Sequence, residues 1–181
     1  MFMKKIIALG GSTSKTSINK KFAYYTASHI ESSDILPLDL NDFAAPLYSI
    51  DEEIANGIPK EAKNLVKLIQ NADGLVLSLA EHNGNFTAGF KNIFDWMTRY
   101  EPKVFANTPI LLLSTSPGGR GGASVMSIAL ERFPRHGASI PAHFSLPSFQ
   151  DNFVNEELTN QELQTELMNQ VKLFVSSIQD Q

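Results

Sequence analysis

Small and hydroxyl-bearing residues crowd the stretch between residues 10 and 19, which reads GGSTSKTSIN. A short apolar run precedes this stretch and a helical pattern follows it, so its backbone leads into the first turn of a helix. The first N–H groups of a helix lack partners within the helix and carry a partial positive charge. Hydroxyls of Ser12, Ser14 and Ser17 can add donors, so the stretch predicts an anion site. The alternative is that these hydroxyls only cap the helix.

The same stretch excludes two common nucleotide motifs. It lacks the Gly-Lys-Ser/Thr that a loop for nucleoside triphosphates places after four spacer residues. It also lacks the G-x-G-x-x-G pattern of a dinucleotide fold. We therefore expect neither a triphosphate site nor a standard NAD site here.

Two further stretches have compositions suited to a flat, polar ligand. Residues 79–96 form a polar turn around Asn83 and Gly84 that runs into an aromatic-rich helix. Residues 114–122, STSPGGRGG, follow another apolar run, and glycines lack the Cβ that would collide with a ring. The alternatives are an ordinary tight turn and a mobile surface loop. The aromatic residues near the first of these stretches are expected in a core or a subunit interface rather than on a cofactor: Phe86, Phe90, Phe94 and Trp96.

The elements that must position these stretches alternate between strands and helices. Apolar runs predict five strands, at residues 5–9, 34–38, 74–79, 110–114 and 139–146. Apolar residues at helical spacing predict helices at about 17–30 and around 62–69, 86–97, 126–133 and 163–178. A capping box of Thr159 and Glu162 is expected to open the last helix.

This alternation predicts an α/β fold, a flavodoxin-like doubly wound three-layer sandwich with a five-stranded parallel sheet in the order 2-1-3-4-5. Ligands of such sheets bind beyond the carboxyl ends of the strands. The three unusual stretches all follow predicted strands, so they are expected to meet at that edge.

Composition narrows the function classes. The chain has 181 residues, with 15 basic against 19 acidic side chains, a balance that favours neither nucleic acid nor an anionic membrane as partner. It has no cysteine, so disulfides, thiolate metal sites and thiol redox chemistry are excluded and redox function needs a cofactor. We expect no metal site and no membrane span, because no stretch approaches twenty apolar residues, and we expect a cytoplasmic protein.

Motifs in the first two stretches resemble those of one enzyme family. The family's turn of proline, glutamate, tyrosine and asparagine precedes a helix that reads leucine-lysine-asparagine-x-x-aspartate-tryptophan, and the matching residues are Glu81, Asn83, Gly84, Lys91, Asn92, Asp95 and Trp96. The family's phosphate motif is matched at Gly11, Ser12, Ser17 and Asn19. Over roughly residues 4–145 the chain thus resembles the NADPH-dependent FMN reductase family, which includes quinone, azo-dye and chromate reductases.

Three positions depart from the family pattern. Ser14 stands where the family has arginine, which removes a fixed positive charge from the phosphate site. Ala80 and His82 stand where the family has proline and tyrosine, so a titratable imidazole replaces a phenol near the flavin.

The resemblance implies that residues 1–181 form a single FMN-binding domain of an oxidoreductase. Such an enzyme passes hydride from NADPH or NADH through FMN to a small-molecule acceptor such as a quinone, an azo compound or free flavin. No catalytic side chain is required, because the cofactor carries the chemistry. The alternatives are a flavodoxin-like electron carrier and a non-catalytic relative that binds flavin weakly.

The resemblance also implies a homodimer or homotetramer and a set of cofactor-binding residues in the three stretches. These residues are Ser12, Ser14, Ser17, Ile18 and Asn19; Glu81, His82, Asn83, Gly84 and Asn85; and Ser116, Pro117, Gly118 and Gly119.

Overall fold

The predicted strands form one parallel sheet in the predicted order. Its strands are β1 (Lys4–Gly11), β2 (Ser33–Leu38), β3 (Gly74–Leu79), β6 (Pro109–Thr115) and β7 (Ser139–Leu146), arranged β2-β1-β3-β6-β7. All four pairings within the sheet are parallel. The computed structural model describes residues 3–179, so residues 1, 2, 180 and 181 of the predicted domain lie outside the described residues.

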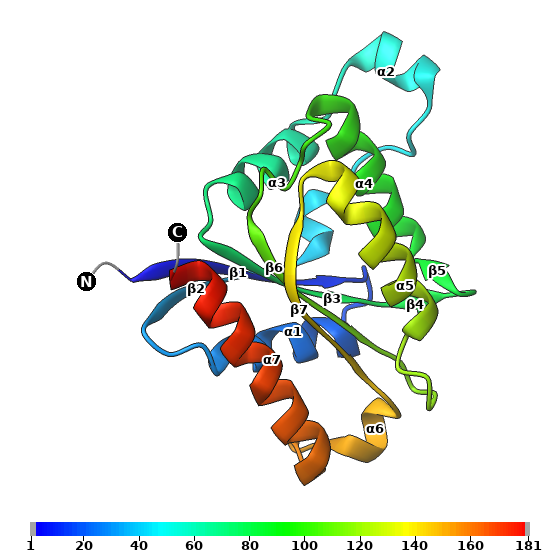
Figure 1. The fold of residues 1–181 in the computed structure, drawn as a ribbon. Coiled ribbons are helices and arrows are strands. Elements are labelled where there is room, and N and C mark those ends of the chain that lie inside the picture. Colours follow the sequence, from blue (N-terminus) through cyan, green and yellow to red (C-terminus); the bar gives the residue numbers. More distant parts are fainter. Residues whose placement is uncertain (1–2, 180–181) are drawn as a thin grey trace.

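Helices cover both faces of this sheet, as Figure 1 shows. One face carries α1 (Ile18–Ser28) and α7 (Gln161–Gln179), and the other carries α3 (Lys60–Gln70), α4 (Ala88–Tyr100) and α5 (Ala123–Arg132). Two 3-10 turns, Leu40–Phe43 and Phe133–His136, complete the second face. This three-layer arrangement confirms the flavodoxin-like fold. Between residues 3 and 179, no helix is long and apolar enough to cross a bilayer.

Successive strand residues divide between two cores, because side chains of a strand alternate between the faces of a sheet. Ile7 and Leu9 of β1 join the core under α3, α4 and α5, whereas Ile6 and Ala8 join the core under α1 and α7. Each large apolar side chain buried this way contributes roughly 1.5–3 kcal/mol.

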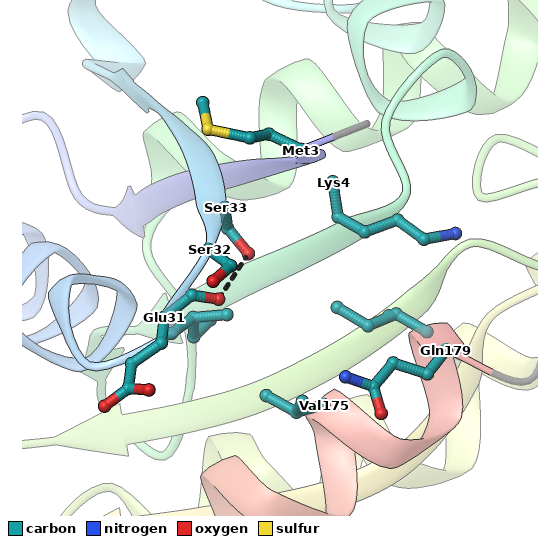
Figure 2. A pocket seen from close by; sticks show the side chains of 9 residues that line it. Met3, Lys4, Glu31, Ser32, Ser33, Val175 and Gln179 are labelled. Carbon is teal, nitrogen blue, oxygen red and sulfur yellow. Dashed lines mark hydrogen bonds between the residues drawn. The ribbon is translucent and has the colours of Figure 1, made fainter. Parts of the chain in front are cut away.

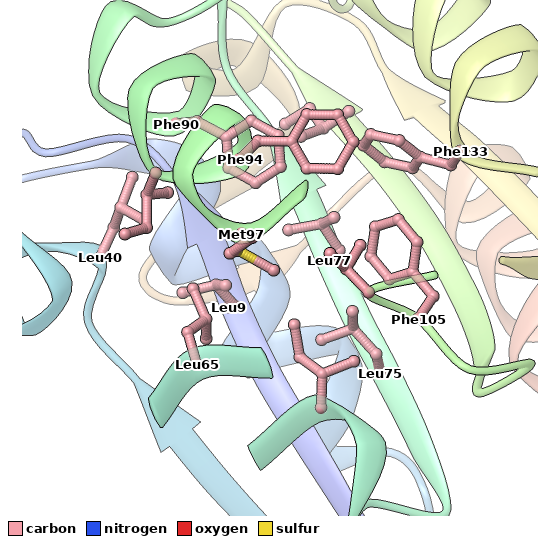
Figure 3. Packing of buried hydrophobic residues seen from close by; sticks show 14 of the residues in the cluster. Leu9, Leu40, Leu65, Leu75, Leu77, Phe90, Phe94, Met97, Phe105 and Phe133 are labelled. Atoms are coloured by element: carbon pink, nitrogen blue, oxygen red, sulfur yellow. The ribbon is translucent and has the colours of Figure 1, made fainter. Parts of the chain in front are cut away.

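The aromatic residues of the stretch 79–96 lie in the core under α3, α4 and α5, where Figure 3 labels Phe90 and Phe94. Phe94 and Phe133 have ring centroids 5.4 Å apart, and the rings of Phe86 and Phe133 are stacked at 5.7 Å. Trp96 is fully buried. These residues therefore stabilise one copy of the chain rather than a contact between copies.

Several short elements lie outside the predicted set. They are α2 (Ile50–Asn56), α6 (Phe149–Asn152), a hairpin of β4 (Glu81–His82) and β5 (Asn85–Phe86), and a hairpin of β8 (Phe153–Val154) and β9 (Glu157–Leu158). Figure 1 shows α2 standing away from the sandwich. None of its residues is buried, so its sequence has no apolar stripe from which the helix could be predicted.

Two local predictions were wrong. Phe86 lies in β5 rather than in a helix, because Thr87 caps α4 by accepting a hydrogen bond from the Phe90 N–H. The predicted capping box of Thr159 and Glu162 does not form.

Asn160 takes the place of Thr159 as the cap of α7. Its Oδ1 accepts from the N–H groups of Glu162 and Leu163 at 3.1 and 3.2 Å. The Thr159 hydroxyl instead donates to the Asn152 carbonyl. Threonine and asparagine both cap helices well, so the sequence pattern did not distinguish Thr159 from Asn160.

Candidate functional site

The side chain of Asn19 joins three elements at the carboxyl edge of the sheet. It is 2% exposed, and its Oδ1 accepts from the Ser78 hydroxyl at 2.7 Å and from the Thr115 N–H at 3.1 Å. Its Nδ2 donates to the Thr115 carbonyl at 3.0 Å. The first turn of α1 is thereby fixed to the ends of β3 and β6. One N–H of the amide is left for any other partner.

The hydroxyl-rich loop, residues 12–17, lies directly on this junction. Ser17 caps α1, since its Oγ accepts from the Lys20 N–H at 3.1 Å. Ser12 Oγ accepts from the Ser14 N–H at 3.2 Å. Both hydroxyls act as acceptors in these bonds, so their O–H groups are still available to donate to an anion. Capping and anion binding are therefore compatible at this loop.

Thr87 holds the hydroxyl-rich loop from the opposite face of the sheet. Its Oγ1 donates to the Gly11 carbonyl at 2.9 Å and is 3.2 Å from the Phe90 N–H that it caps. The start of α4 and the end of β1 thus share one buried side chain.

The stretch after β3 folds into a tight hairpin. Asn83 and Gly84, its central residues, have φ of 52° and 75°, the conformation of a type I′ turn. Asn85 Oδ1 accepts from the Phe86 N–H at 2.8 Å. The hairpin presents His82 as an exposed side chain.

Glu81, at the start of this hairpin, caps a distant helix. Its Oε2 accepts from the N–H groups of Ser124 and Val125 at 2.9 and 3.0 Å, in the first turn of α5. A carboxylate at a helix N-terminus is favoured by the helix dipole. Glu81 therefore fixes the hairpin to the helix that follows the glycine-rich loop.

The glycine-rich loop, residues 116–122, is anchored at both ends. Ser114 Oγ donates to the Gly121 carbonyl at 2.8 Å, and Thr115 Oγ1 donates to the Leu146 carbonyl at 2.8 Å. Pro117, Gly118 and Gly119 form its exposed tip.

A hollow of about 220 Å³ lies where the hydroxyl-rich loop, the hairpin and the glycine-rich loop meet. Nine predicted residues line it: Ser12, Ser14, Ser17, Ile18, Asn19, Glu81, His82, Ser116 and Pro117. The predicted residues Asn83, Gly84, Asn85, Gly118 and Gly119 belong to its loops but not to its lining. Four lining residues were not predicted: Thr16, Ala80, Thr115 and Gln150. The first three adjoin predicted residues, whereas Gln150 follows the fifth strand, where no motif pointed to a site.

Hydroxyl and amide side chains make up most of the polar lining of the hollow. Among the described residues that line it, none is lysine or arginine, and the acidic residue is Glu81, whose Oε2 is held by α5. Hydroxyls at a helix N-terminus suit a phosphate, and an exposed loop tip without bulky side chains suits a ring edge. The residues present therefore fit FMN, with its phosphate toward the hydroxyl-rich loop.

Lys20 lies one turn into α1, and its charge is paired with Asp39. Their Nζ and Oδ2 are 2.6 Å apart. The hydrogen bond from Lys20 lowers the pKa of Asp39 and raises the pKa of Lys20 itself. This nearby cation is thus held at the end of β2.

A larger hollow of about 550 Å³ lies at the opposite edge of the sheet (Figure 2). Met3, Lys4, Ser33 and Gln179 are among its lining residues. It contains none of the predicted site residues and lies at the amino ends of β1 and β2. Ligands of parallel sheets bind beyond the carboxyl ends of the strands. The smaller hollow is therefore the candidate site, although its volume is smaller.

Helix residues of the family motif hold the segment before α2 rather than the hollow. Asn92 Oδ1 accepts from the Tyr48 N–H at 2.8 Å, and Trp96 Nε1 donates to the Pro46 carbonyl at 2.7 Å. Lys91 pairs with Asp95 one turn later at 2.7 Å. This part of the motif has a structural role within the chain.

The fold and the hollow define a flavodoxin-like protein with a candidate binding site at the carboxyl edge of its sheet. Residues 4–151 match the family described as NADPH-dependent FMN reductase, and the chain belongs to that family. The resemblance of its motifs is thereby confirmed. The description of that family names a reductase that depends on NADPH and acts with FMN.

Several curated relatives carry reductase names. A quinone reductase from Escherichia coli strain K12 is 36% identical over 78 residues, which are 43% of this chain and 42% of the relative. The aligned part of the chain thus spans less than half of that relative's length. A 2-hydroxy-1,4-benzoquinone reductase from Burkholderia is 33% identical over 125 residues, which are 68% of this chain and 66% of the relative.

A solved structure has the same fold along nearly the whole chain. The flavoenzyme NAD(P)H:(acceptor) oxidoreductase FerB from Paracoccus denitrificans aligns with a TM-score of 0.78 at 22% identity. The alignment covers 98% of both chains.

Proposed function

We propose that this chain is an FMN-dependent NAD(P)H oxidoreductase that reduces small-molecule acceptors such as quinones, azo compounds or free flavin. The observation that carries the proposal is the meeting of three loops in one hollow. The loops follow β1, β3 and β6, and the chain belongs to a family of FMN reductases.

The hydroxyl-rich loop is proposed to bind the phosphate. Ser12, Ser14 and Ser17 line the hollow beside the first turn of α1, so their hydroxyls and its first N–H groups are the proposed donors. Ile18 and Asn19 contribute backbone of the first turn, while the Asn19 amide positions the loop. Without an arginine at Ser14, this site relies on neutral donors and the helix dipole.

The hairpin and the glycine-rich loop are proposed to border the flavin ring. Residues 82–85 and 116–119 offer backbone N–H groups and side-chain amides to ring carbonyls, and Glu81 fixes the hairpin in place. Bound FMN supplies the chemistry of accepting and returning a hydride. The loops orient the ring, and their N–H groups stabilise negative charge on it.

Three further properties are proposed from the sequence and the family. They are a single domain over residues 1–181, a homodimer or homotetramer, and a cytoplasmic location. The acceptor class follows the names of the quinone reductase and benzoquinone reductase relatives.

Titration of the purified protein with FMN, followed by quenching of flavin fluorescence, tests the cofactor. Oxidation of NADPH and NADH by the FMN-loaded protein is then measured against quinones, an azo dye and free flavin. We expect FMN uptake and rapid acceptor-dependent turnover. Bound flavin that reacts with neither nucleotide would indicate an electron carrier, and failure to take up FMN would indicate a non-catalytic relative.

A further inference from the structure

Gln150 lines the hollow from a fourth loop, which follows β7. It lies in α6 and its side chain is exposed. No motif of the three predicted stretches includes it. An amide side chain in a hollow without lysine or arginine is a candidate ligand contact, because it offers two N–H donors.

The loop that carries Gln150 is fixed to the glycine-rich loop by backbone bonds. The Ser148 N–H donates to the Gly118 carbonyl at 3.0 Å, and the Phe149 N–H donates to the Ser116 carbonyl at 3.1 Å. Ser148 has a φ of 44°, a left-handed conformation that turns the chain into α6. The position of Gln150 is therefore determined by neighbouring parts of the site.

Packing sets Gln150 on the same face of the sheet as α1. Phe149 and Phe153 stack at 4.7 Å, and Phe153 meets the ring of Tyr25 on α1 at 5.1 Å. Phe149 and Phe153 belong to the core under α1 and α7. Gln150 therefore lies on the side of the hollow where the hydroxyl-rich loop begins α1, whereas the hairpin lies toward α5 on the other face.

We propose that the side-chain amide of Gln150 donates to the phosphate of FMN and so helps the protein distinguish FMN from riboflavin. The inference rests on the proposed function. It assigns to a neutral amide part of the role of the absent arginine, since neither lysine nor arginine is among the described residues that line the hollow.

Substitutions of opposite charge test this role. Gln150→Glu places a negative charge beside the phosphate and is expected to raise the FMN dissociation constant about tenfold or more at low ionic strength. Gln150→Lys is expected to lower it by about the same factor. Riboflavin lacks the phosphate, so its dissociation constants for the wild type, Gln150→Glu and Gln150→Lys should agree within about twofold.

Gln179→Glu is the matched control, because it makes the same charge change at the opposite edge of the sheet (Figure 2). It should leave both dissociation constants unchanged. An unchanged FMN affinity in Gln150→Glu and Gln150→Lys, or an equal change for FMN and riboflavin, overturns the inference. Tighter FMN binding by Gln150→Lys cannot arise from damage to the fold. A wild-type protein that binds neither flavin overturns the proposed function instead.

Discussion

Single side chains that bond to distant segments of the chain position the loops of this site. Glu81 is one of them, since its carboxylate is the acceptor for two N–H groups of α5 that have no partner within the helix. It belongs to the family motif, and its bonds here are made to the protein. Its contribution to binding is therefore expected to act through the placement of the hairpin.

Removal of this cap should destabilise the protein measurably. Glu81→Ala leaves the Ser124 and Val125 N–H groups without an acceptor and is expected to lower the free energy of unfolding by about 1–2 kcal/mol. Glu81→Gln keeps an acceptor but loses the charge, so it should cost about half as much. Urea unfolding measures both. Glu131→Ala, at the exposed other end of α5, should have little effect. Equal stability of Glu81→Ala and the wild type would contradict the cap.

The pair of Lys20 and Asp39 predicts a stability that depends on pH. The pKa of Asp39 is lowered, chiefly by the hydrogen bond from Lys20. Its contribution to the free energy of unfolding is therefore present above the ordinary carboxyl pKa and disappears as pH falls through the lowered pKa. Lys20 has a raised pKa, so its contribution disappears only as pH rises past the ordinary lysine range.

Asp39→Asn should therefore be less stable than the wild type by about 0.5–1 kcal/mol between about pH 5 and 9, because a partly exposed pair contributes little more. The difference should begin to shrink below about pH 4, where the carboxylate of the unfolded chain takes up a proton, and should disappear as pH falls through the lowered pKa of the folded state. Thermal unfolding across pH measures it. Asp34→Asn, at an exposed position of the preceding strand β2, serves as the control. A difference that persists at low pH would assign the effect to something other than the charge.

At the scale of elements, the glycine-rich loop requires glycine at position 121 for both its conformation and its packing. Gly121 has a φ of 58°, and a Cβ there would lie 2.8 Å from the carbonyl carbon and oxygen of Leu146. Gly119 has open space around its Cβ position. The two glycines therefore differ in what they contribute, although the sequence presents them alike.

Gly121→Ala is expected to cost about 1–3 kcal/mol of stability, because it combines strain with a backbone collision. Gly119→Ala should stay within about 0.5 kcal/mol of the wild type, as exposed substitutions usually do. If Gly119 borders the flavin, its variant should bind FMN more weakly while melting at the same temperature. Thermal unfolding measures the loss of stability, and FMN titration measures the loss of binding. A Gly121→Ala variant as stable as the wild type would contradict the predicted strain and collision.

The strands, the longer helices and the strand order were predictable, because continuous apolar runs and helical stripes report burial directly. The hydroxyl-rich loop was predictable for a similar reason, since its composition and its place before a helix both indicate a site. The hairpin within residues 79–96 was not predicted, because two-residue strands such as β4 and β5 carry no periodicity.

Contacts between distant segments were not predictable from one sequence. The acceptor for the α5 cap lies 43 residues before it, at Glu81, and the Asn19 amide meets Thr115, 96 residues later. Gln150 was missed because its position depends on backbone bonds to the glycine-rich loop rather than on any local pattern.

At the scale of the whole molecule, the segment around α2 carries exposed apolar side chains. Leu47 is 83% exposed and Ile54 is 77% exposed, and Ile50 is 52% exposed. Polar bonds from α4 hold this segment, among them the pair of Arg99 and Glu53 at 2.8 Å. A held, apolar and exposed segment is suited to a contact between copies of the chain.

We therefore expect the predicted homo-oligomer to use this segment. The triple variant Leu47→Ser, Ile50→Ser, Ile54→Ser should raise the dissociation constant of the assembly by about 100-fold or more, since each buried apolar side chain contributes more than about 1 kcal/mol. Analytical ultracentrifugation measures the shift. Leu173→Ser, at an exposed apolar position of α7, is the control. A wild-type monomer, or a variant that associates as the wild type does, would exclude this contact.

The buried amide of Asn19 has a consequence for how acceptor preference can change. The Asn19 amide fixes α1 to the ends of β3 and β6. We therefore expect the base of the hollow to keep the same width with every acceptor. Differences in the size and shape of acceptors must then be accommodated by the hairpin tip and the glycine-rich tip, which are exposed. Grafting these two tips from a relative onto this chain should transfer that relative's preference among acceptors. The affinity for the phosphate of FMN should stay the same.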